Sequence, residues 1–217
     1  MYLRNEERST THISSGAPCE KSVMRGENEF SLWAILECNE CLLEAIDMAE
    51  QLALPNWYIG AGCVVQTVWN YLSGLPINHG IKDVDLVYYD PNDRSDQSEL
   101  ATSEKVKNLL PNFPLHIDVN NQARVHLWYE QYFGYPIEAY KSVEDAIDTW
   151  PTTATATAVR KNGSYRHVYS PFGLGDLFSM TARPNKRQIT RNIYEDKVNR
   201  WKKNWPKLTV VPWESEA

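Results

Sequence analysis

The stretch that decides the fold is residues 57–90, WYIGAGCVVQTVWNYLSGLPINHGIKDVDLVYYD. It begins with three β-forming residues, 57–59, that run directly into the glycine turn 60–62. Apolar side chains then recur at helical spacing, and Gly74 stands where a glycine commonly ends a helix. A second β-forming run follows at 83–88. The pattern therefore predicts a strand, a tight turn, a helix, a loop and a second strand.

The second strand carries two acidic residues, Asp83 and Asp85. Alternate side chains on a strand share a face, so both carboxylates point the same way, roughly 6.6 Å apart along the chain. Val84 and Leu86 then point to the opposite face and are expected to lie in the hydrophobic core. Two neighbouring carboxylates repel, and a fold accommodates them best when a cation lies between them.

A third acidic residue lies on a later strand. Residues 115–119 (LHIDV) alternate, with Ile117 on the apolar face and Asp118 on the polar face together with His116. A single Asp on a strand is often only a polar end residue. His116 is most simply an ordinary residue of the polar face.

The turn Ile59-Gly60-Ala61-Gly62 followed by Asp83-Val84-Asp85-Leu86 resembles the core of the polymerase-beta-like nucleotidyltransferase superfamily. The usual turn has Gly-Gly or Gly-Ser, whereas Ala61 stands here at the second position. Residues 152–160 and 171–185 are similar to a family of small nucleotidyltransferase-like proteins, and that resemblance covers about residues 30 to 207. It implies an α/β (α+β) fold in which helices flank a small mixed β-sheet with a nucleotidyltransferase-like core.

The resemblance also implies a role for each motif. The glycine turn would hold the phosphates of a nucleoside triphosphate, and the acids would hold divalent metal, Mg²⁺ or Mn²⁺, as two ions. The implied catalytic and metal-binding residues are Asp83, Asp85 and Asp118. The implied nucleotide-binding residues are Gly60, Ala61, Gly62, Lys82, Thr155 and Arg160. From the residues alone, Thr155 and Arg160 are equally well explained as parts of an ordinary threonine-rich strand.

The rest of the chain divides into one polar tail and one domain. Residues 1–27 are polar and lack periodicity, which predicts a flexible N-terminal tail, and residues 28–217 are expected to form a single domain. Helical spacing and capping signals predict helices at 29–54, 100–110, 123–133, 142–150, 174–180 and 188–205. An Asn-Gly turn near 161–164 predicts a hairpin between 152–160 and 165–169.

Composition excludes several classes of protein. Hydrophobic residues make up 42% of the 217 residues, which argues against a disordered chain. No apolar run approaches the ~20 residues of a membrane span, and four cysteines are few for the length. These features favour a cytoplasmic protein without a membrane partner. The chain also lacks a P-loop and a complete dinucleotide-binding fingerprint.

The charge pattern bears on the partner. The formal net charge is −6, yet residues 183–207 hold nine Lys or Arg and only two acids. That segment is either a solvated helix face or an anion-binding face, and with an RNA partner Arg187, Arg191, Arg200 and Lys203 would contact phosphates.

The leading hypothesis is a metal-dependent nucleotidyltransferase that moves a nucleoside monophosphate from a triphosphate such as ATP to a hydroxyl group. A small molecule or a protein is favoured over RNA as the acceptor, because the whole chain is acidic. The alternatives are a non-catalytic nucleotide-binding module and an interaction protein that keeps the fold.

Overall fold

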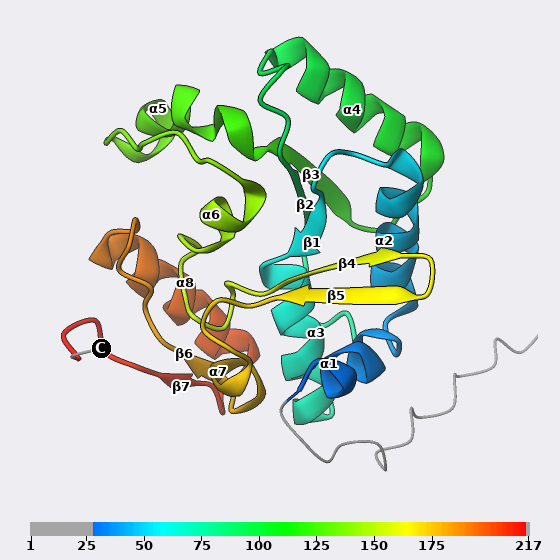
Figure 1. Cartoon of the computed structure of the whole chain (residues 1–217). Helices are drawn as coiled ribbons and strands as arrows, with labels where there is room; N and C mark the ends of the chain where they lie inside the picture. Colours follow the sequence, from blue (N-terminus) through cyan, green and yellow to red (C-terminus); the bar gives the residue numbers. More distant parts are fainter. Residues whose placement is uncertain (1–27, 216–217) are drawn as a thin grey trace, which may run out of the picture.

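A computed structural model describes residues 28–215, and the tail expected at 1–27 lies outside them. The centre of the fold is a five-stranded sheet in the order β3-β2-β1-β4-β5 (Figure 1). Strands β2 and β3 are parallel, and the other neighbours are antiparallel. The strands are β1 (Tyr58–Gly60), β2 (Asp83–Tyr88), β3 (His116–Asn121), β4 (Ala158–Asn162) and β5 (Tyr165–Tyr169). The expected small mixed sheet flanked by helices is confirmed.

Helices lie on both sides of this sheet (Figure 1). On one side α2 (Glu40–Leu52), α3 (Gly62–Ser73) and α4 (Asp96–Leu109) pack with Val84 and Leu86 of β2 in the main hydrophobic core. The other side holds η2 (Gln122–Leu127), α5 (Tyr129–Phe133) and α6 (Val143–Ile147), whereas α8 (Arg191–Asn204) lies beside α3, where Tyr194, Val198 and Trp201 join the main core. Because side chains alternate along β2, its two aspartates point to this second side.

The helix expected at 29–54 is wrong as a single element. The structure has two helices, α1 (Glu29–Leu36) and α2, and α2 starts after Asn39. The Asn39 side chain accepts a hydrogen bond from the Leu42 amide at 3.1 Å and donates one to Thr67 at 2.9 Å. Asn39 therefore acts as an N-cap, a role that favours starting a new helix over continuing the previous one.

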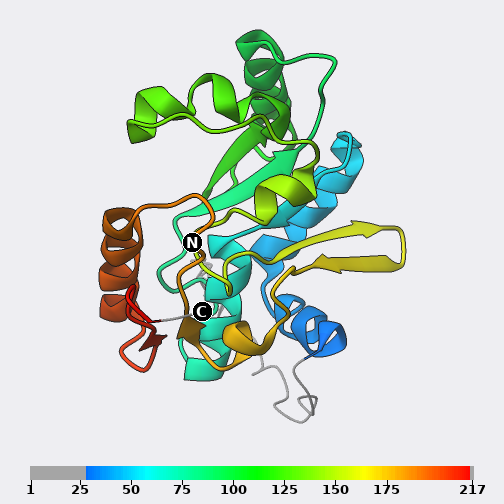
Figure 2. The same ribbon diagram turned by 60° about the vertical axis from the view of Figure 1, so that its left-hand side comes forward.

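Two further expected elements are shorter than the patterns indicated. Residues 123–133 form η2 and α5 rather than one helix. In the expected hairpin only Ala158 to Asn162 and Tyr165 to Tyr169 pair, and this hairpin projects from the body of the molecule (Figure 2). Residues 152–157 form a buried turn, because the Thr152 and Thr155 hydroxyls hydrogen-bond each other at 2.8 Å.

The C-terminal part closes the structure beside α3. Short elements α7 (Gly175–Phe178), β6 (Thr181–Ala182) and β7 (Thr209–Val210) lead into and out of α8. Trp201 and Trp205 of this part pack edge-on against Trp69 of α3, with ring centroids 5.6 and 5.5 Å away. These indole contacts fix α8 to the core, so the inner face of α8 is held at a set position beside the sheet.

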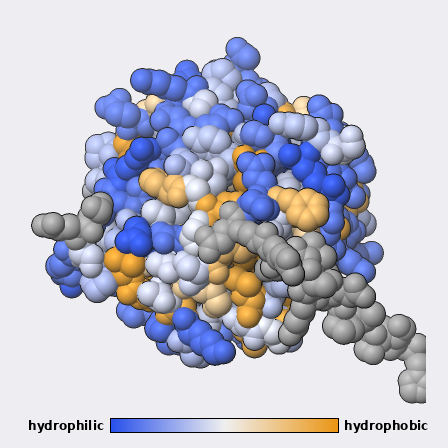
Figure 3. Space-filling model, turned by 60° about the horizontal axis from the view of Figure 1, so that its bottom comes forward, coloured by the Kyte–Doolittle hydropathy of each residue, from blue (hydrophilic) through white to orange (hydrophobic). Residues whose placement is uncertain are grey.

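On the face shown in Figure 3, hydrophobic side chains form separate patches among polar ones, which is ordinary for a globular protein. None of the helices between residues 28 and 215 has the length and hydropathy that crossing a membrane requires.

Candidate functional site

The three aspartates identified in the sequence lie on one face of two neighbouring parallel strands. Asp85 of β2 is in register with Asp118 of β3, and Asp83 is in register with His116. All three aspartates line one cavity of about 390 Å³. Asp83 and Asp118 are exposed, whereas Asp85 is half-buried beneath them. The parallel register therefore gathers residues that are 33 to 35 positions apart in the chain.

The turn before α3 forms the floor of the cavity next to Asp85. Ala61 and Gly62 both line the cavity, and Ala61 has φ +55° and ψ −127°. The Ala61 amide donates a hydrogen bond to the Thr157 carbonyl at 3.1 Å. The next amide, that of Gly62, donates to the Asp85 carboxylate. The start of α3 thus directs its backbone dipoles towards the acidic residues, as anion-binding helix termini do.

Gly60, expected among the nucleotide-binding residues, is buried in β1 and is absent from the residues lining the cavity. A Cβ atom at this position would lie 2.7 Å from the Ala158 Cβ and 2.7 Å from the Trp150 ring. Packing therefore requires a glycine here. At Gly62 an added Cβ would meet only the flexible Gln66 side chain, at 3.0 Å.

The acidic cluster changes the protonation of its buried member. Burial, followed by the charges of Asp83 and Asp118, raises the pKa of Asp85, and the charge of Lys197 and the Gly62 amide lower it; the net result is a pKa of about 7. Burial, reinforced by Asp85 and Asp83, also raises the pKa of the Cys63 thiol, which stays protonated. A cation placed among the carboxylates would reverse this effect on Asp85.

The wall opposite the aspartates comes from α8. Lys197 and Arg200 line the cavity from this helix. Burial lowers the pKa of Lys197, and the neighbouring Arg200 lowers it further, while Asp85 and Asp83 raise it. Sequence reasoning missed Lys197, although it lies four residues from both Ile193 and Trp201, two apolar residues whose helical spacing marks the inner face of α8.

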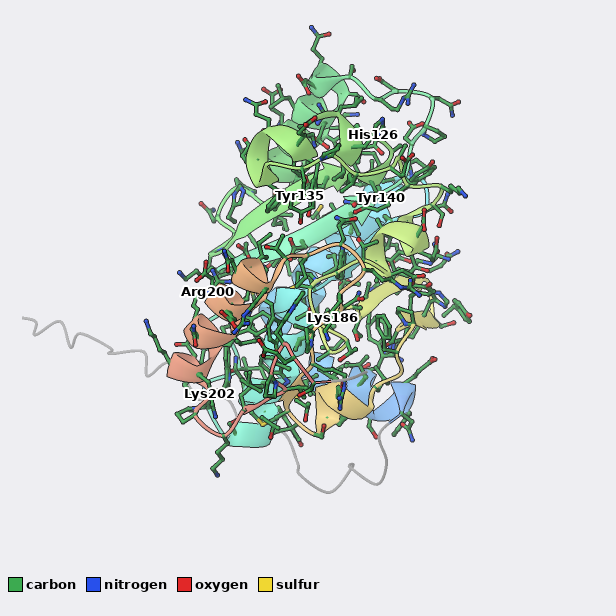
Figure 4. The ribbon with its side chains drawn as sticks, turned by 90° about the vertical axis from the view of Figure 1, so that its left-hand side faces the viewer. His126, Tyr135, Tyr140, Lys186, Arg200 and Lys202 are labelled. Atoms are coloured by element: carbon green, nitrogen blue, oxygen red, sulfur yellow. The ribbon has the colours of Figure 1, made fainter. Side chains whose placement is uncertain are left out.

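The remaining wall is aromatic. It consists of Val125, Trp128, Tyr129, Phe133 and Tyr140. The Tyr140 hydroxyl donates to the Gln188 side chain at 2.8 Å, and the Tyr135 hydroxyl donates to the Gln188 carbonyl at 2.9 Å. Figure 4 shows Tyr135 and Tyr140 above α8, the helix that carries Arg200 and Lys202. This wall carries no formal charge, in contrast to the acidic and basic walls.

The other expected nucleotide-binding residues are not brought together. Thr155 lines the cavity, but its hydroxyl is bonded to Thr152. Lys82 is exposed and is not among the lining residues. Arg160 lies outside the lining too, with its guanidinium 4.7 Å from the centroid of the Tyr58 ring. The structure thus groups Asp83, Asp85, Asp118, Ala61, Gly62 and Thr155, and separates Gly60, Lys82 and Arg160 from them.

The donor set suits a hard divalent cation. Among residues 28–215, no three His, Cys, Asp or Glu side chains form a ready-made metal site. Mg²⁺, however, is usually held by one or two carboxylates together with water and substrate phosphates, not by an all-protein cage. This kind of coordination fits Asp85 and Asp118. The two like-charged side chains lie at paired positions of neighbouring strands, and both line the open cavity.

Comparisons with known proteins bear on the family and on the fold. Residues 47–210 match the model of a family described as nucleotidyltransferase. An NMR structure described as revealing a CCA-adding enzyme head domain has the same fold, with a TM-score of 0.71 and 21% sequence identity over 86% of this chain and 97% of that chain. No curated protein matches the sequence.

Proposed function

This chain belongs to the nucleotidyltransferase family that it matches over residues 47–210, and on that premise we propose that it transfers a nucleoside monophosphate from a triphosphate to the hydroxyl group of a small acceptor, with divalent metal. One observation carries the proposal. The register of β2 and β3 brings Asp83, Asp85 and Asp118 into one cavity, at the start of α3.

Each group in the cavity then has a role. Asp83, Asp85 and Asp118 would hold two Mg²⁺ or Mn²⁺ ions, which when bound lower the pKa of the acceptor hydroxyl and neutralise the leaving pyrophosphate. The amino end of α3 would favour the phosphates through the positive end of its helix dipole, while the Gly62 amide stays with Asp85. The Asp118 carboxylate, which is exposed to the cavity, would also accept the proton of the acceptor hydroxyl.

The size and chemistry of the cavity support a small acceptor. Its volume of about 390 Å³ is in the range of small-molecule sites. Its aromatic wall bears only neutral polar groups, the Tyr140 hydroxyl and the Gln188 amide among them. A neutral wall suits an uncharged ring or sugar better than a phosphodiester chain, which binds through cationic side chains.

The test compares the wild type with Asp83→Asn/Asp85→Asn by calorimetric titration of Mg²⁺ and each of the four common nucleoside triphosphates. We expect the wild type to bind a triphosphate only with Mg²⁺, and the double variant to lose at least about 100-fold in affinity, because each lost carboxylate removes a charged ligand of the metal.

The matched control is Glu104→Gln/Glu138→Gln, which removes two carboxylates from exposed positions outside the cavity. It should bind as the wild type does. Unchanged affinity in a folded Asp83→Asn/Asp85→Asn protein would refute the metal site.

The alternative is a nucleotide-binding module without turnover. Ala61 favours it, because this residue occupies a backbone conformation that suits glycine at the point nearest the phosphates. Release of pyrophosphate from a bound triphosphate separates the two functions. Mg²⁺-dependent binding with no release, across small-molecule, protein and tRNA acceptor pools, would favour the module.

A further inference from the structure

Two cationic side chains of α8, Lys197 and Arg200, face the cavity without a fixed partner. They lie one turn apart on the helix and both line the cavity opposite the aspartates. Within the described part of the chain, neither side chain forms an ion pair or a hydrogen bond. Lys197 is half-buried, so its charge is partly removed from water.

The neighbouring cations of the same basic segment are different, because carboxylates already neutralise them. Arg187 pairs with Asp148 at 2.9 Å, and Arg183 pairs with Asp176 at 2.9 Å. Arg191 pairs with Glu195 at 2.6 Å and also with Glu214. The positive charges of residues 183–207 that have no carboxylate partner are therefore of two kinds: Lys197 and Arg200, which line the cavity, and the exposed lysines.

The placement of Lys197 is costly without a ligand. Removing an ammonium from water disfavours its charge, and Arg200 adds repulsion. Only the aspartates across the cavity offset these two effects, through space and not through an ion pair. A ligand with several negative charges next to α8 would neutralise both cations with charge-assisted hydrogen bonds.

We propose that Lys197 and Arg200 bind the β- and γ-phosphates of the nucleoside triphosphate and the pyrophosphate that leaves. This proposal rests on the proposed function, in which the cavity binds a triphosphate. Lys197 then has two partners in turn. Without ligands, the positive charge of Lys197 is attracted through space by Asp83 and Asp85, and it therefore competes with a divalent cation for these carboxylates. Once a metal–triphosphate complex is bound, Lys197 pairs with phosphate oxygens.

The exchange of partners predicts effects of opposite sign in Lys197→Met, which keeps an unbranched side chain of nearly the same length and removes its charge. Mn²⁺ alone should bind about threefold more tightly, because a competing positive charge is gone. The Mg²⁺–triphosphate complex should bind at least about tenfold more weakly, because a charge-assisted hydrogen bond is lost. The corresponding nucleoside monophosphate, which lacks the β- and γ-phosphates, should bind with nearly unchanged affinity.

The measurement is calorimetric titration of the full chain with Mn²⁺ alone, with Mg²⁺–triphosphate and with Mg²⁺–monophosphate. Lys203→Met is the matched control, since Lys203 is an exposed lysine on the same helix outside the cavity, and it should leave all three affinities unchanged. Arg200→Met is a second variant with the same expected loss of triphosphate affinity. It carries the test if Lys197→Met fails to fold, as judged by circular dichroism.

Three results would overturn the proposal. If folded Lys197→Met and Arg200→Met bind the triphosphate like the wild type, the cations do not contact phosphate. If only Mn²⁺ affinity rises, Lys197 is merely the counter-charge of the aspartates. If the wild type itself binds no triphosphate with Mg²⁺, the proposed function fails and this inference fails with it.

Discussion

At the scale of single residues, Ala61 has a backbone conformation that is unfavourable for a residue with a side chain. Its φ of +55° with ψ −127° is a conformation that L-residues rarely adopt, and no side chain caps the helix that begins there. Such a conformation costs about 1–3 kcal/mol for a residue with a Cβ atom. The sequence marked Ala61 only as a departure from a glycine-rich turn, because a dihedral angle cannot be seen in a pattern of residue types.

Ala61→Gly should therefore stabilise the protein by about 1 kcal/mol, since relief of strain outweighs the entropy that a glycine adds to the unfolded chain. Urea unfolding of the metal-free protein measures this change. The same substitution at Ala101, an exposed position inside α4, should destabilise by about 1 kcal/mol. Equal losses at both positions would show that Ala61 is not strained.

Residue patterns identified the acids but not their complete surroundings. Asp83, Asp85 and Asp118 were predictable because alternation along a strand assigns each side chain to a face. Lys197 and the aromatic wall were not, because their approach to the acids depends on how α8 and η2–α5 pack over the sheet. Gly60 was assigned to phosphate binding since a glycine turn has that common use, yet contacts with Ala158 and Trp150 explain it as packing.

At the scale of elements, the strand–turn–helix–strand unit was predicted almost to the residue, because propensity, periodicity and a C-terminal glycine agree there. The failures share one physical cause, which is that a polar side chain satisfies backbone groups locally. Asn39 interrupts an apolar stripe by capping α2, and the hydroxyls of Thr152 and Thr155 bond each other where alternation indicated a strand. The short β6–β7 pair has too few residues to leave a pattern.

Strand β2 makes the stability of the metal-free protein depend on pH. Its Asp85 has a pKa raised to about 7 in the folded protein, against 3.8 for an ordinary aspartate. The folded state therefore binds the proton more tightly, so the stabilising contribution is complete below about pH 4 and is lost as the pH rises to 7.

Asp85→Asn should remove this dependence. The wild type should lose about 2 kcal/mol relative to the variant between pH 5 and pH 8 in a chelator. Adding Mg²⁺ should reduce the loss at pH 8, because a metal binds the ionised carboxylate. Urea unfolding of both proteins at both pH values measures the effect. Subtracting the free energy of unfolding of the variant from that of the wild type cancels the contributions of other titrating groups. If this difference is the same at pH 5 and pH 8, the pKa of Asp85 is not raised.

At the scale of the whole molecule, the distribution of charge bears on the acceptor. The chain has a net charge of −6, and much of its basic segment is neutralised by nearby carboxylates, as at Arg187 and Arg191. Of the cations that would have contacted an RNA, Arg200 turns into the cavity. Four exposed lysines of this segment, Lys186, Lys202, Lys203 and Lys207, have no carboxylate partner among the described residues. They provide only a modest positive surface on an acidic body, so long-range attraction to a polyanion should be weak.

We therefore expect RNA to bind weakly, with a shallow dependence on salt. Each phosphate contact contributes about 0.7–0.9 to the slope of log K against log salt, so these four lysines limit the slope to a magnitude of about 3. Binding of a tRNA pool at two salt concentrations measures it for the wild type and for Lys203→Glu/Lys207→Glu, whose changes lie outside the cavity. A slope steeper than about −4 that the variant abolishes would reverse the choice of acceptor. RNA would then bind along the outer face of α8, while Lys197 and Arg200 stayed with the triphosphate inside.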